Sequence, residues 1–488
     1  MAPSPTGRPT PQQHYGNEPI AMPTNTSATL PHPRWRLPII GDLLTIDLAN
    51  PCQGLAKDNV ARGGIVEQRI FDVPVIVLSD AGLIDDVNNE AAWEKHVGHS
   101  LRKLRPVAGD GLFTAYNHEP NWQKAHNILM PAFTKAAMES YHPTMTATVR
   151  ELTDAWTTRA ADNSWIDIPA EANRLTTEIV ARAGIGHSFN KLDDTNEDPF
   201  ITTVLRELKY ANRRTDAIPF YEKFFGQAQR RQHQQDKAWL REQVATIIND
   251  RRNTGPHTET RDMLDYMLNT ADPDSGEHLD DANITNQILT LLVAGSETSA
   301  NAIGFALHFL AHHPDIAAAA RTEIDQRWPS RDFPDIAFDD VARLRYLRRV
   351  VDETLRLWPV APGYFRQAKT DTTIGDGKYH FATGDWVFVL LLAAHRDPNT
   401  WGPDADQFRP DRFLPENLRS LPRYVYKPFG TGARACIGRQ FALHEIMLTL
   451  AAVLHQFDLQ PEPGYTLKVS ETLTLKPDAL RLRLKPRQ

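Results

Sequence analysis

The chain has 488 residues, of which 41% are apolar and 24% are charged. This balance is typical of a globular protein with a large buried core and excludes general disorder. Lys and Arg number 54 against 61 Asp and Glu, a net charge of −7, so there is no strong positive field to attract nucleic acid or anionic lipid. The two cysteines, Cys52 and Cys436, exclude a disulfide scaffold and favour a reducing compartment.

The start of the chain is rich in Pro, Thr, Asn and Gln, and no basic segment followed by an apolar one occurs there. We therefore expect a disordered tail over residues 1–33 and a single domain over residues 34–488. Because neither a signal peptide nor an N-terminal membrane anchor is recognisable, the sequence predicts a cytoplasmic protein.

Two patterns follow the tail. β-branched residues in near alternation over residues 62–80 predict a small N-terminal sheet. Apolar residues at helical spacing over residues 122–270 predict a run of helices. Breaks in that run are predicted at Pro131, Pro143 and Pro219.

Strands are predicted to return over residues 373–390 and 465–484, so the predicted fold class is mainly α with a minor β lobe. The longest predicted helix covers residues 284–310, about 40 Å at the usual rise, and Glu297 is its only formally charged residue. Polar residues punctuate this helix and interface anchors are missing, which favours a helix buried in the core over a membrane span. Gly and polar side chains are costly inside a buried helix unless something uses them, so residues 295–298 are a candidate functional segment.

One cysteine lies in a glycine-rich loop directly before a predicted helix. Residues 429–438 read Phe-Gly-Thr-Gly-Ala-Arg-Ala-Cys-Ile-Gly, and residues 439–450 have helical apolar spacing. The loop amides and the positive end of the helix favour the thiolate form of Cys436, a good ligand for a soft metal centre. A buried structural cysteine is the alternative, but the fixed spacing of Phe, glycines and Arg around Cys436 favours a ligand.

In this loop the sequence resembles the cytochrome P450 family, whose haem-binding loop reads Phe-x-x-Gly-x-Arg-x-Cys-x-Gly. The fixed positions all match, at Phe429, Gly432, Arg434, Cys436 and Gly438. The resemblance implies the cytochrome P450 fold and a bound haem b, with Cys436 as the axial ligand of the iron and Phe429 and Arg434 as further haem-binding residues. A thiolate ligand pushes electron density onto the iron and favours cleavage of the O–O bond, so we expect a monooxygenase.

The resemblance assigns further residues to the haem. Trp122 and His126 are four apart on a predicted helix and can face one ligand, and Arg434 adds a cation with bidentate donors. Together they are expected to hold the two haem propionates, with Lys95 as an additional candidate. A core Trp beside a hydrogen-bonded His is the alternative. Relatives often have Arg or Lys where His126 stands, so neutral hydrogen bonding is expected at that position.

Glu297 and Thr298 match the acid-alcohol pair of the family, in the helix that crosses the distal face of the haem. We expect them to be catalytic: the hydroxyl holds oxygen and an ordered water, and the acid links that water to solvent. A hydroxyl bonded to its own helix carbonyl is the alternative for Thr298. Glu353 and Arg356 match a buried structural pair of the family, joined by an Arg of residues 408–413, and are expected to serve folding rather than turnover.

The resemblance extends over about residues 37–477 and is closest to the haem domains of self-sufficient bacterial fatty-acid hydroxylases, through residues 109–113, 121–131 and 471–477. By position, four apolar residues are expected to line the substrate pocket. These are Phe113, Ala294, Ala361 and Leu473. Apolar side chains of this kind are otherwise plain core residues.

Two features depart from those hydroxylases. A flavin-binding region does not follow the haem domain before Gln488, so separate electron donors are expected, a ferredoxin or flavodoxin with its NAD(P)H reductase. The early strand lacks the Arg and Tyr that hold a carboxylate, and Asp72 would repel one unless Arg69 or the basic run near Arg213 compensates.

The leading hypothesis is therefore an O2-dependent monooxygenase that hydroxylates or otherwise oxidises an apolar or amphipathic small molecule, such as an intermediate of secondary metabolism. A fatty-acid hydroxylase with a shifted anchor is the first alternative. A peroxide-driven enzyme is less favoured, because enzymes of that kind generally lack the acid-alcohol pair. From another class, a haem-binding sensor without turnover is a further alternative, against which Glu297 and Thr298 argue.

Overall fold

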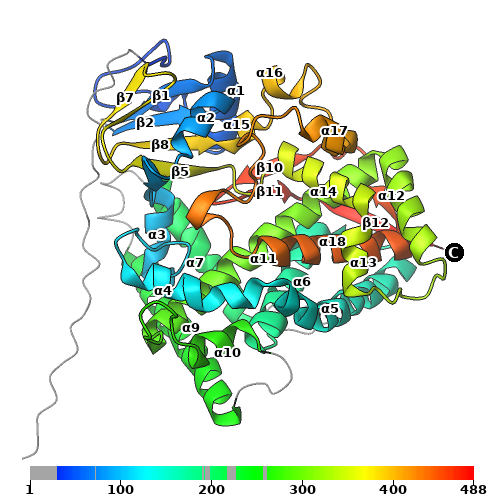
Figure 1. Cartoon of the computed structure of the whole chain (residues 1–488). Helices are drawn as coiled ribbons and strands as arrows, with labels where there is room; N and C mark the ends of the chain where they lie inside the picture. The colour runs from blue at the N-terminus through cyan, green and yellow to red at the C-terminus, as the bar shows by residue number, and fades with distance from the viewer. Residues whose placement is uncertain are drawn as a thin grey trace, which may run out of the picture.

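The computed structural model describes residues 30–71, 73–189, 192, 198–216, 227–255 and 261–487. Three predictions fall outside these residues: the tail over residues 1–29, the repulsive Asp72 and the helix break at Pro219. In the described part, helices fill most of the molecule and a smaller sheet lobe lies at the upper left of Figure 1. The predicted fold class, mainly α with a minor β lobe, is confirmed.

The sheet lobe combines strands from early and late parts of the chain. Its five strands are, in spatial order, β1 (Ile65–Ile70), β2 (Val73–Leu78), β8 (Trp386–Leu390), β5 (Gly363–Ala368) and β3 (Trp93–Lys95). The β2–β8 pair is parallel and the others are antiparallel. The predicted N-terminal sheet over residues 62–80 is the β1–β2 hairpin, whereas β5, which lies between β8 and β3, was missed.

Residues 30–33, which were predicted as tail, lie against this lobe. Leu30 is buried and belongs to a core cluster with Ile65 and Leu78. The carbonyl of Pro31 accepts a hydrogen bond of 2.8 Å from the backbone N–H of Glu67. The packed part of the chain therefore begins before residue 34.

Three small sheets complete the strands. They comprise β4 (Ile166–Asp167) with β12 (Arg481–Pro486) and β9 (Phe457–Pro461), β6 (Thr372–Ile374) with β7 (Tyr379–Phe381), and β10 (Lys468–Glu471) with β11 (Leu475–Asp478). The predicted return of strands over residues 373–390 and 465–484 is confirmed by β6 to β8 and by β10 to β12.

The helices form the larger part of the molecule (Figure 1). In the described residues they are α1 (Pro51–Ala61), α2 (Ala81–Val87), α3 (His99–Ala108), α4 (Pro120–Leu129), α5 (Lys135–Ala161), α6 (Ile168–Ile179), α7 (Pro199–Asp216), α9 (Gln227–Thr254), α10 (Met263–Asn269), α11 (Asp281–His312), α12 (Pro314–Arg327), α13 (Phe338–Arg343), α14 (Arg345–Leu357), α15 (Leu391–Ala394), α16 (Pro398–Trp401), α17 (Pro415–Leu418) and α18 (Arg439–Gln456). The predicted run of helices over residues 122–270 corresponds to α4 to α10.

The prediction of a helix break at Pro143 is wrong. Pro143 lies inside α5, which continues from Lys135 to Ala161, whereas Pro131 does lie in a short 3-10 turn between α4 and α5. A proline removes one helix hydrogen bond, but α5 buries Met145 and Trp156 in the main core beyond it. Packing of this buried face outweighs the local cost.

The longest helix, α11, passes through the core. The side chain of Asp280 caps its start by accepting from the N–H of Asn283, and α11 packs against α6 and α18. Among the described residues it is the one helix long and apolar enough to cross a membrane, but 67% of its most apolar window is buried inside the protein. The prediction of a core helix over residues 284–310 is confirmed.

A single carboxylate ties the start of α1 to β10. The N–H groups of Cys52 and Gln53 donate to the two carboxylate oxygens of Glu471, at 2.7 and 3.2 Å. The first amides of a helix lack partners within it, and the helix dipole favours an anion there. Burial and Glu471 raise the pKa of the Cys52 thiol well above its usual range, so Cys52 is a neutral packing residue.

Candidate active site

Cys436 is held by a tight loop that precedes α18. Gly430 and Gly432 both have φ of 69°, a left-handed conformation that glycine adopts without strain. A side chain at Gly432 would in addition overlap the carboxylate of Glu90. The N–H of Cys436 donates to the carbonyl of Phe429 at 2.9 Å, which closes the loop and fixes the direction of the cysteine.

The Cys436 side chain is accessible, and it also has protein atoms around it. The residue is exposed, yet burial raises the pKa of its thiol, against the lowering effects of the Gly438 backbone N–H and of Arg439. A soft metal ion that displaces the proton would remove the cost of burying this thiolate.

The middle of α11 is also open on one face. Ala294, Glu297 and Thr298 keep partial exposure, although the helix is buried on both sides of them. Their spacing of three and four residues places them on one stripe of the helix. The stripe lies on α11 and the Cys436 loop leads directly into α18, and these two helices pack against each other.

The structure brings together the four residues expected at the propionates. The guanidinium of Arg434 lies 4.4 Å from the Trp122 ring centroid, and Trp122 stacks on His126 with centroids 5.0 Å apart. Burial is the largest cause that lowers the pKa of Lys95 and of His126, and Arg434 lowers both further. Three distant segments, β3, α4 and the cysteine loop, thus meet at one cationic cluster.

This cluster fits the two carboxylates of haem b. Nδ1 of His126 is buried without a hydrogen-bond partner among the described residues, a costly state for an imidazole nitrogen. Burial lowers the pKa of Arg434 to about 10, so the cluster holds more positive charge than its surroundings stabilise. Anionic oxygen acceptors would satisfy the nitrogen and neutralise Arg434 and Lys95.

The acid and the alcohol of α11 have separate partners in this structure. Thr298 Oγ1 donates to the carbonyl of Ala294 at 2.7 Å, the alternative considered from the sequence. Glu297 Oε1 accepts from Thr474 Oγ1 at 3.0 Å. Burial raises the pKa of Glu297, opposed by the Thr474 hydrogen bond and by Lys476. Glu297 is therefore a carboxyl group that retains a proton more readily than usual.

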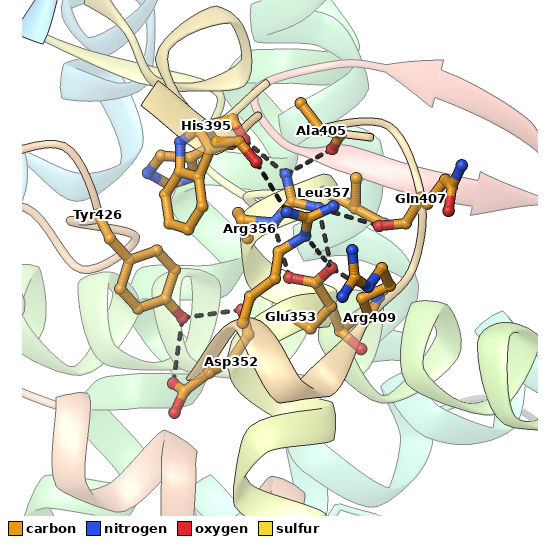
Figure 2. A network of polar contacts seen from close by, with 12 residues as sticks. Asp352, Glu353, Arg356, Leu357, His395, Ala405, Gln407, Arg409 and Tyr426 are labelled. Atoms are coloured by element: carbon orange, nitrogen blue, oxygen red, sulfur yellow. Dashed lines mark hydrogen bonds and ion pairs between the residues drawn. The ribbon is translucent and has the colours of Figure 1, made fainter. Parts of the chain in front are cut away.

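Glu353 and Arg356 form a buried pair at the centre of a polar network (Figure 2). Both side chains are 0% exposed and the closest nitrogen and oxygen are 2.6 Å apart. Glu353 also accepts from the backbone N–H of Arg409 at 2.8 Å, and the Arg412 guanidinium lies 3.4 Å away. The pair thus joins α14 to the segment 408–413, as the sequence predicts.

The four expected pocket residues come from separate segments. Phe113 and Leu473 are partly buried and pack against the main core, Ala294 lies on the open stripe of α11, and Ala361 is exposed before β5. None of these four side chains is fully buried, which a pocket lining requires. The four residues stay proposed pocket residues.

Two polar features of this region were not predicted. Asp110, next to Phe113, accepts from carboxamides of α4 and α11. Glu445 of α18 is completely buried, and neither carboxyl oxygen has a hydrogen-bond partner among the described residues. The signal for Asp110 was a Gly-Asp-Gly turn together with Asn and Gln in a buried helix. For Glu445 the only signal was a carboxylate on a largely apolar helix.

Comparisons with known proteins follow the same pattern. The family model described as Cytochrome P450 matches residues 31–484. A bifunctional cytochrome P450/NADPH–P450 reductase of Bacillus cereus is 39% identical over 462 residues, 94% of this chain and 42% of that protein. A self-sufficient cytochrome P450 monooxygenase, CYP505E5 of Aspergillus niger, is 36% identical over 450 residues, 92% of this chain and 42% of that protein. The chain therefore spans about two fifths of the length of these relatives.

A solved structure extends the likeness to three dimensions. The crystal structure of a cytochrome P450 (CYP102L1) matches with a TM-score of 0.89 and 60% sequence identity, and covers 94% of this chain and 99% of that chain. The predicted family, fold and haem b cofactor are confirmed. With a family model that matches nearly its whole length and relatives well above 30% identity, this chain belongs to the cytochrome P450 family of haem b monooxygenases.

Proposed function

We propose that the protein uses O2 and external electrons to oxidise an apolar or amphipathic small molecule. The observation that carries this proposal is the arrangement of Cys436 before α18 and of Glu297 and Thr298 on α11, the helix packed against α18. Haem b, when bound through a thiolate, supplies the activation of oxygen. The haem would be held by Cys436 and by the cluster of Trp122, His126, Arg434 and Lys95, with Phe429 as a further haem-binding residue.

Glu297 and Thr298 are the proposed proton route. Burial favours the protonated form of Glu297, which makes it a proton donor near neutral pH. The Thr298 hydroxyl bonds to its own helix carbonyl and still has lone pairs that accept from an ordered water. We propose that this water receives its proton from Glu297 by way of a small side-chain rotation.

A cationic patch beside the cysteine loop supports an acidic electron donor. Arg423 and Arg439 are exposed and Lys427 is half-buried, and none of the three forms an ion pair with another described residue. Burial lowers the pKa of Lys427, and Arg439 and Arg423 lower it further. Arg439 also acts on the pKa of Cys436, so the patch adjoins the iron ligand. An acidic ferredoxin or flavodoxin with its NAD(P)H reductase is the proposed partner. The name of the Bacillus cereus relative supports a donor linked to NADPH.

The substrate is proposed to be largely apolar, for example an intermediate of secondary metabolism. The first strand offers no free cation, because Arg69 donates to Glu67 at 3.1 Å. Asp72 and the side chain of Arg213 lie outside the described residues. A fatty-acid hydroxylase is the second candidate, supported by the likeness in residues 109–113 and 471–477. Because both cysteines are unpaired, we place the protein in the reducing cytoplasm.

The first test is an optical titration of the purified ferric protein with dodecanoic acid, read at the Soret band. A shift to high spin would show that the acid enters the distal pocket and would favour the fatty-acid candidate. A normal low-spin thiolate spectrum without a shift would favour a substrate that lacks a carboxylate. Added redox partners and NADPH should then drive product formation from a bound ligand, and a complete lack of turnover with every ligand that shifts the spectrum would favour the sensor.

A further inference from the structure

The loop between α3 and α4 is held against α11 by side-chain amides. Oδ1 of Asp110 accepts from Nδ2 of Asn283 and of Asn286, at 2.9 and 2.8 Å. Its other oxygen accepts from Nδ2 of Asn121 at 2.7 Å. A carboxylate with three neutral donors is well satisfied, so this end of the loop has one defined position on the helix.

Glycines allow the close approach. A side chain at Gly109 would overlap the carboxamide of Asn286, and one at Gly111 would overlap the hydroxyl of Thr290. Gly109 also has φ of 54°, where other residues are strained. The loop backbone therefore lies directly on α11, without side chains between them.

Gln287 extends this attachment to the residue before Phe113. Its side chain is 0% exposed. Oε1 accepts from the N–H of Leu112 at 2.9 Å, and Nε2 donates to Oδ1 of Asn283 at 3.1 Å. The main chain that enters Phe113 is thus fixed to α11 by a buried hydrogen bond.

Lys95 holds the main chain that leaves Phe113. Its ammonium donates to the carbonyl of Phe113 at 2.5 Å and lies 5.4 Å from the centroid of the same ring. Lys95 was expected at the propionates. Its three donors allow it to bind the Phe113 carbonyl and a propionate at the same time. Phe113 is consequently anchored on one side by Gln287 and on the other by Lys95.

Gln287 also shares a stripe of α11 with the catalytic candidates. Ala294 follows it by seven residues and Thr298 by eleven, spacings that return to the same face of a helix. The distance along the axis from Gln287 to Thr298 is about 16 Å. The Phe113 loop and the Thr298 hydroxyl are therefore mounted on one rigid element.

We propose that Gln287 and Lys95 are positioning residues that fix the Phe113 ring relative to Thr298 and so determine which position of an apolar substrate is oxidised. This inference rests on the proposed function. It assigns a specificity role to buried groups that do not themselves touch the substrate. Gln287 gives the cleaner test, because Lys95 is also a candidate ligand of the haem.

The first experiment compares two probes in the holoprotein, imidazole and 4-phenylimidazole. Imidazole lacks the phenyl ring that would contact Phe113, a proposed pocket residue. In Gln287→Ala we expect an unchanged Kd for imidazole and a Kd for 4-phenylimidazole altered about fivefold, the effect of one ordinary hydrogen bond. Phe113→Ala should change the same ratio, and Gln287→Glu, which keeps the acceptor oxygen, should restore it. A wild-type ratio in Gln287→Ala together with an altered ratio in Phe113→Ala would overturn the proposal.

The second experiment measures amide hydrogen exchange in residues 109–116. Loss of the acceptor for Leu112 should accelerate exchange there about fivefold in Gln287→Ala. Asn127→Ala is the matched control. It removes a carboxamide of α4 whose partners are Asp272 and Asp274 and not the Phe113 loop, so exchange in residues 109–116 should stay unchanged. Unchanged exchange in Gln287→Ala would show that the loop is not anchored there, and would overturn the proposal.

The third experiment addresses specificity with dodecanoic acid and a surrogate ferredoxin system. If the wild type oxidises this probe, Gln287→Ala and Lys95→Met should broaden the distribution of oxidised positions, and Lys95→Arg should restore it. An unchanged distribution would overturn the specificity role. If the wild type does not oxidise the probe, the fatty-acid candidate fails, whereas the imidazole ratio and the exchange rates still decide the positioning role.

Discussion

Arg356 donates from every nitrogen of its guanidinium, and its side chain has 0% exposure. Besides Glu353, its partners are the main-chain carbonyls of His395, Ala405 and Gln407, at 2.7, 2.7 and 3.2 Å. The planar fork thus joins α14 to the long segment that leads to the cysteine loop (Figure 2). A lysine carries its three donors on a single nitrogen and cannot span the same set of partners as the planar fork.

Arg356→Lys should therefore abolish most of the folded haem protein. The change weakens the buried pair with Glu353 and leaves some of these carbonyls without a donor in the interior, a loss of about 3–5 kcal/mol. Soret absorbance per protein and circular dichroism would measure it. Arg349→Lys is the matched control on the same helix, where the partner Asp411 is 64% exposed, and it should cost less than about 1 kcal/mol. Equal behaviour of the two variants would contradict the structural role.

Thr298→Ala should uncouple electron use from product formation. Without the hydroxyl the proposed ordered water lacks its hydrogen-bond partner on α11. We therefore expect the amount of product per NADPH to fall about tenfold or more and hydrogen peroxide to form instead. Binding of substrate, followed by the Soret shift, should be retained. Thr298→Ser keeps the hydroxyl and should keep most of the coupling. Normal coupling in Thr298→Ala would show that the hydroxyl serves only its bond to Ala294.

At this scale the sequence indicated the residue types but not their partners. The loop of residues 429–438 identified Cys436 because its spacing is specific. The hydroxyl direction of Thr298 and the bond of Lys95 to a main-chain carbonyl depend on rotamers and on segments far away in the chain. Neither leaves a signal in the local pattern.

Among the elements, the contact between α11 and α18 holds an unusual group. Glu445 of α18 is completely buried, and burial raises the pKa of its carboxyl well above the usual range, although the nearby Ser299 hydroxyl of α11, which is outside hydrogen-bond geometry, acts to lower it. Such a group is neutral in the folded protein and ionised in the unfolded chain at neutral pH. Its contribution to the free energy of unfolding is therefore constant below the ordinary Glu pKa and falls as pH rises toward the folded pKa.

Glu445→Gln should remove the loss in the free energy of unfolding that accompanies a rise in pH. In the wild type this group makes unfolding easier by up to about 1.4 kcal/mol per pH unit above the ordinary Glu pKa, and the amide should flatten the dependence and raise the Tm at pH 8. Thermal unfolding at pH 5, 6, 7 and 8 would measure it. The same change at the exposed Glu139 of α5 should retain the wild-type slope. An unchanged or steeper slope in Glu445→Gln would contradict a neutral Glu445.

The helices and strands were largely predictable where one hydrophobic pattern continued over many residues. The apolar run of residues 284–310 gave α11, and alternation gave the β1–β2 hairpin. β5 was missed because its sequence, Gly-Tyr-Phe-Arg-Gln-Ala, has no β-branched residue and owes its strand conformation to neighbours on both sides. The uninterrupted α5 differs from its prediction for a related reason, since core packing decides whether a proline ends a helix.

Over the whole molecule, one positive surface patch stands in contrast to the negative net charge. The net charge is −7, yet Arg423, Lys427 and Arg439 leave a positive patch beside Cys436, the proposed iron ligand. A field of this kind guides an acidic partner and weakens with salt. The family likeness predicted the overall fold well, but it did not predict this patch, which depends on which cations are left without an ion pair.

Arg423→Glu combined with Lys427→Glu should slow electron delivery from an acidic ferredoxin. We expect a second-order rate lower by about tenfold at low salt, and a difference that disappears when salt screens the surface. Stopped-flow reduction over a range of ionic strength would measure it. Arg230→Glu, at an exposed position of α9, should have little effect. A rate that does not depend on the patch or on salt would move the docking site elsewhere.

The cap that Glu471 places on α1 also bears on how the protein is made. The residues that it joins are 419 positions apart, and β2 pairs with β8 across a similarly long interval. At about 5–20 residues per second on the ribosome, roughly 20–80 s pass between their synthesis. The lobe that emerges first is therefore completed among the last, and in the meantime the open edge of its hairpin is exposed to aggregation and to chaperone binding.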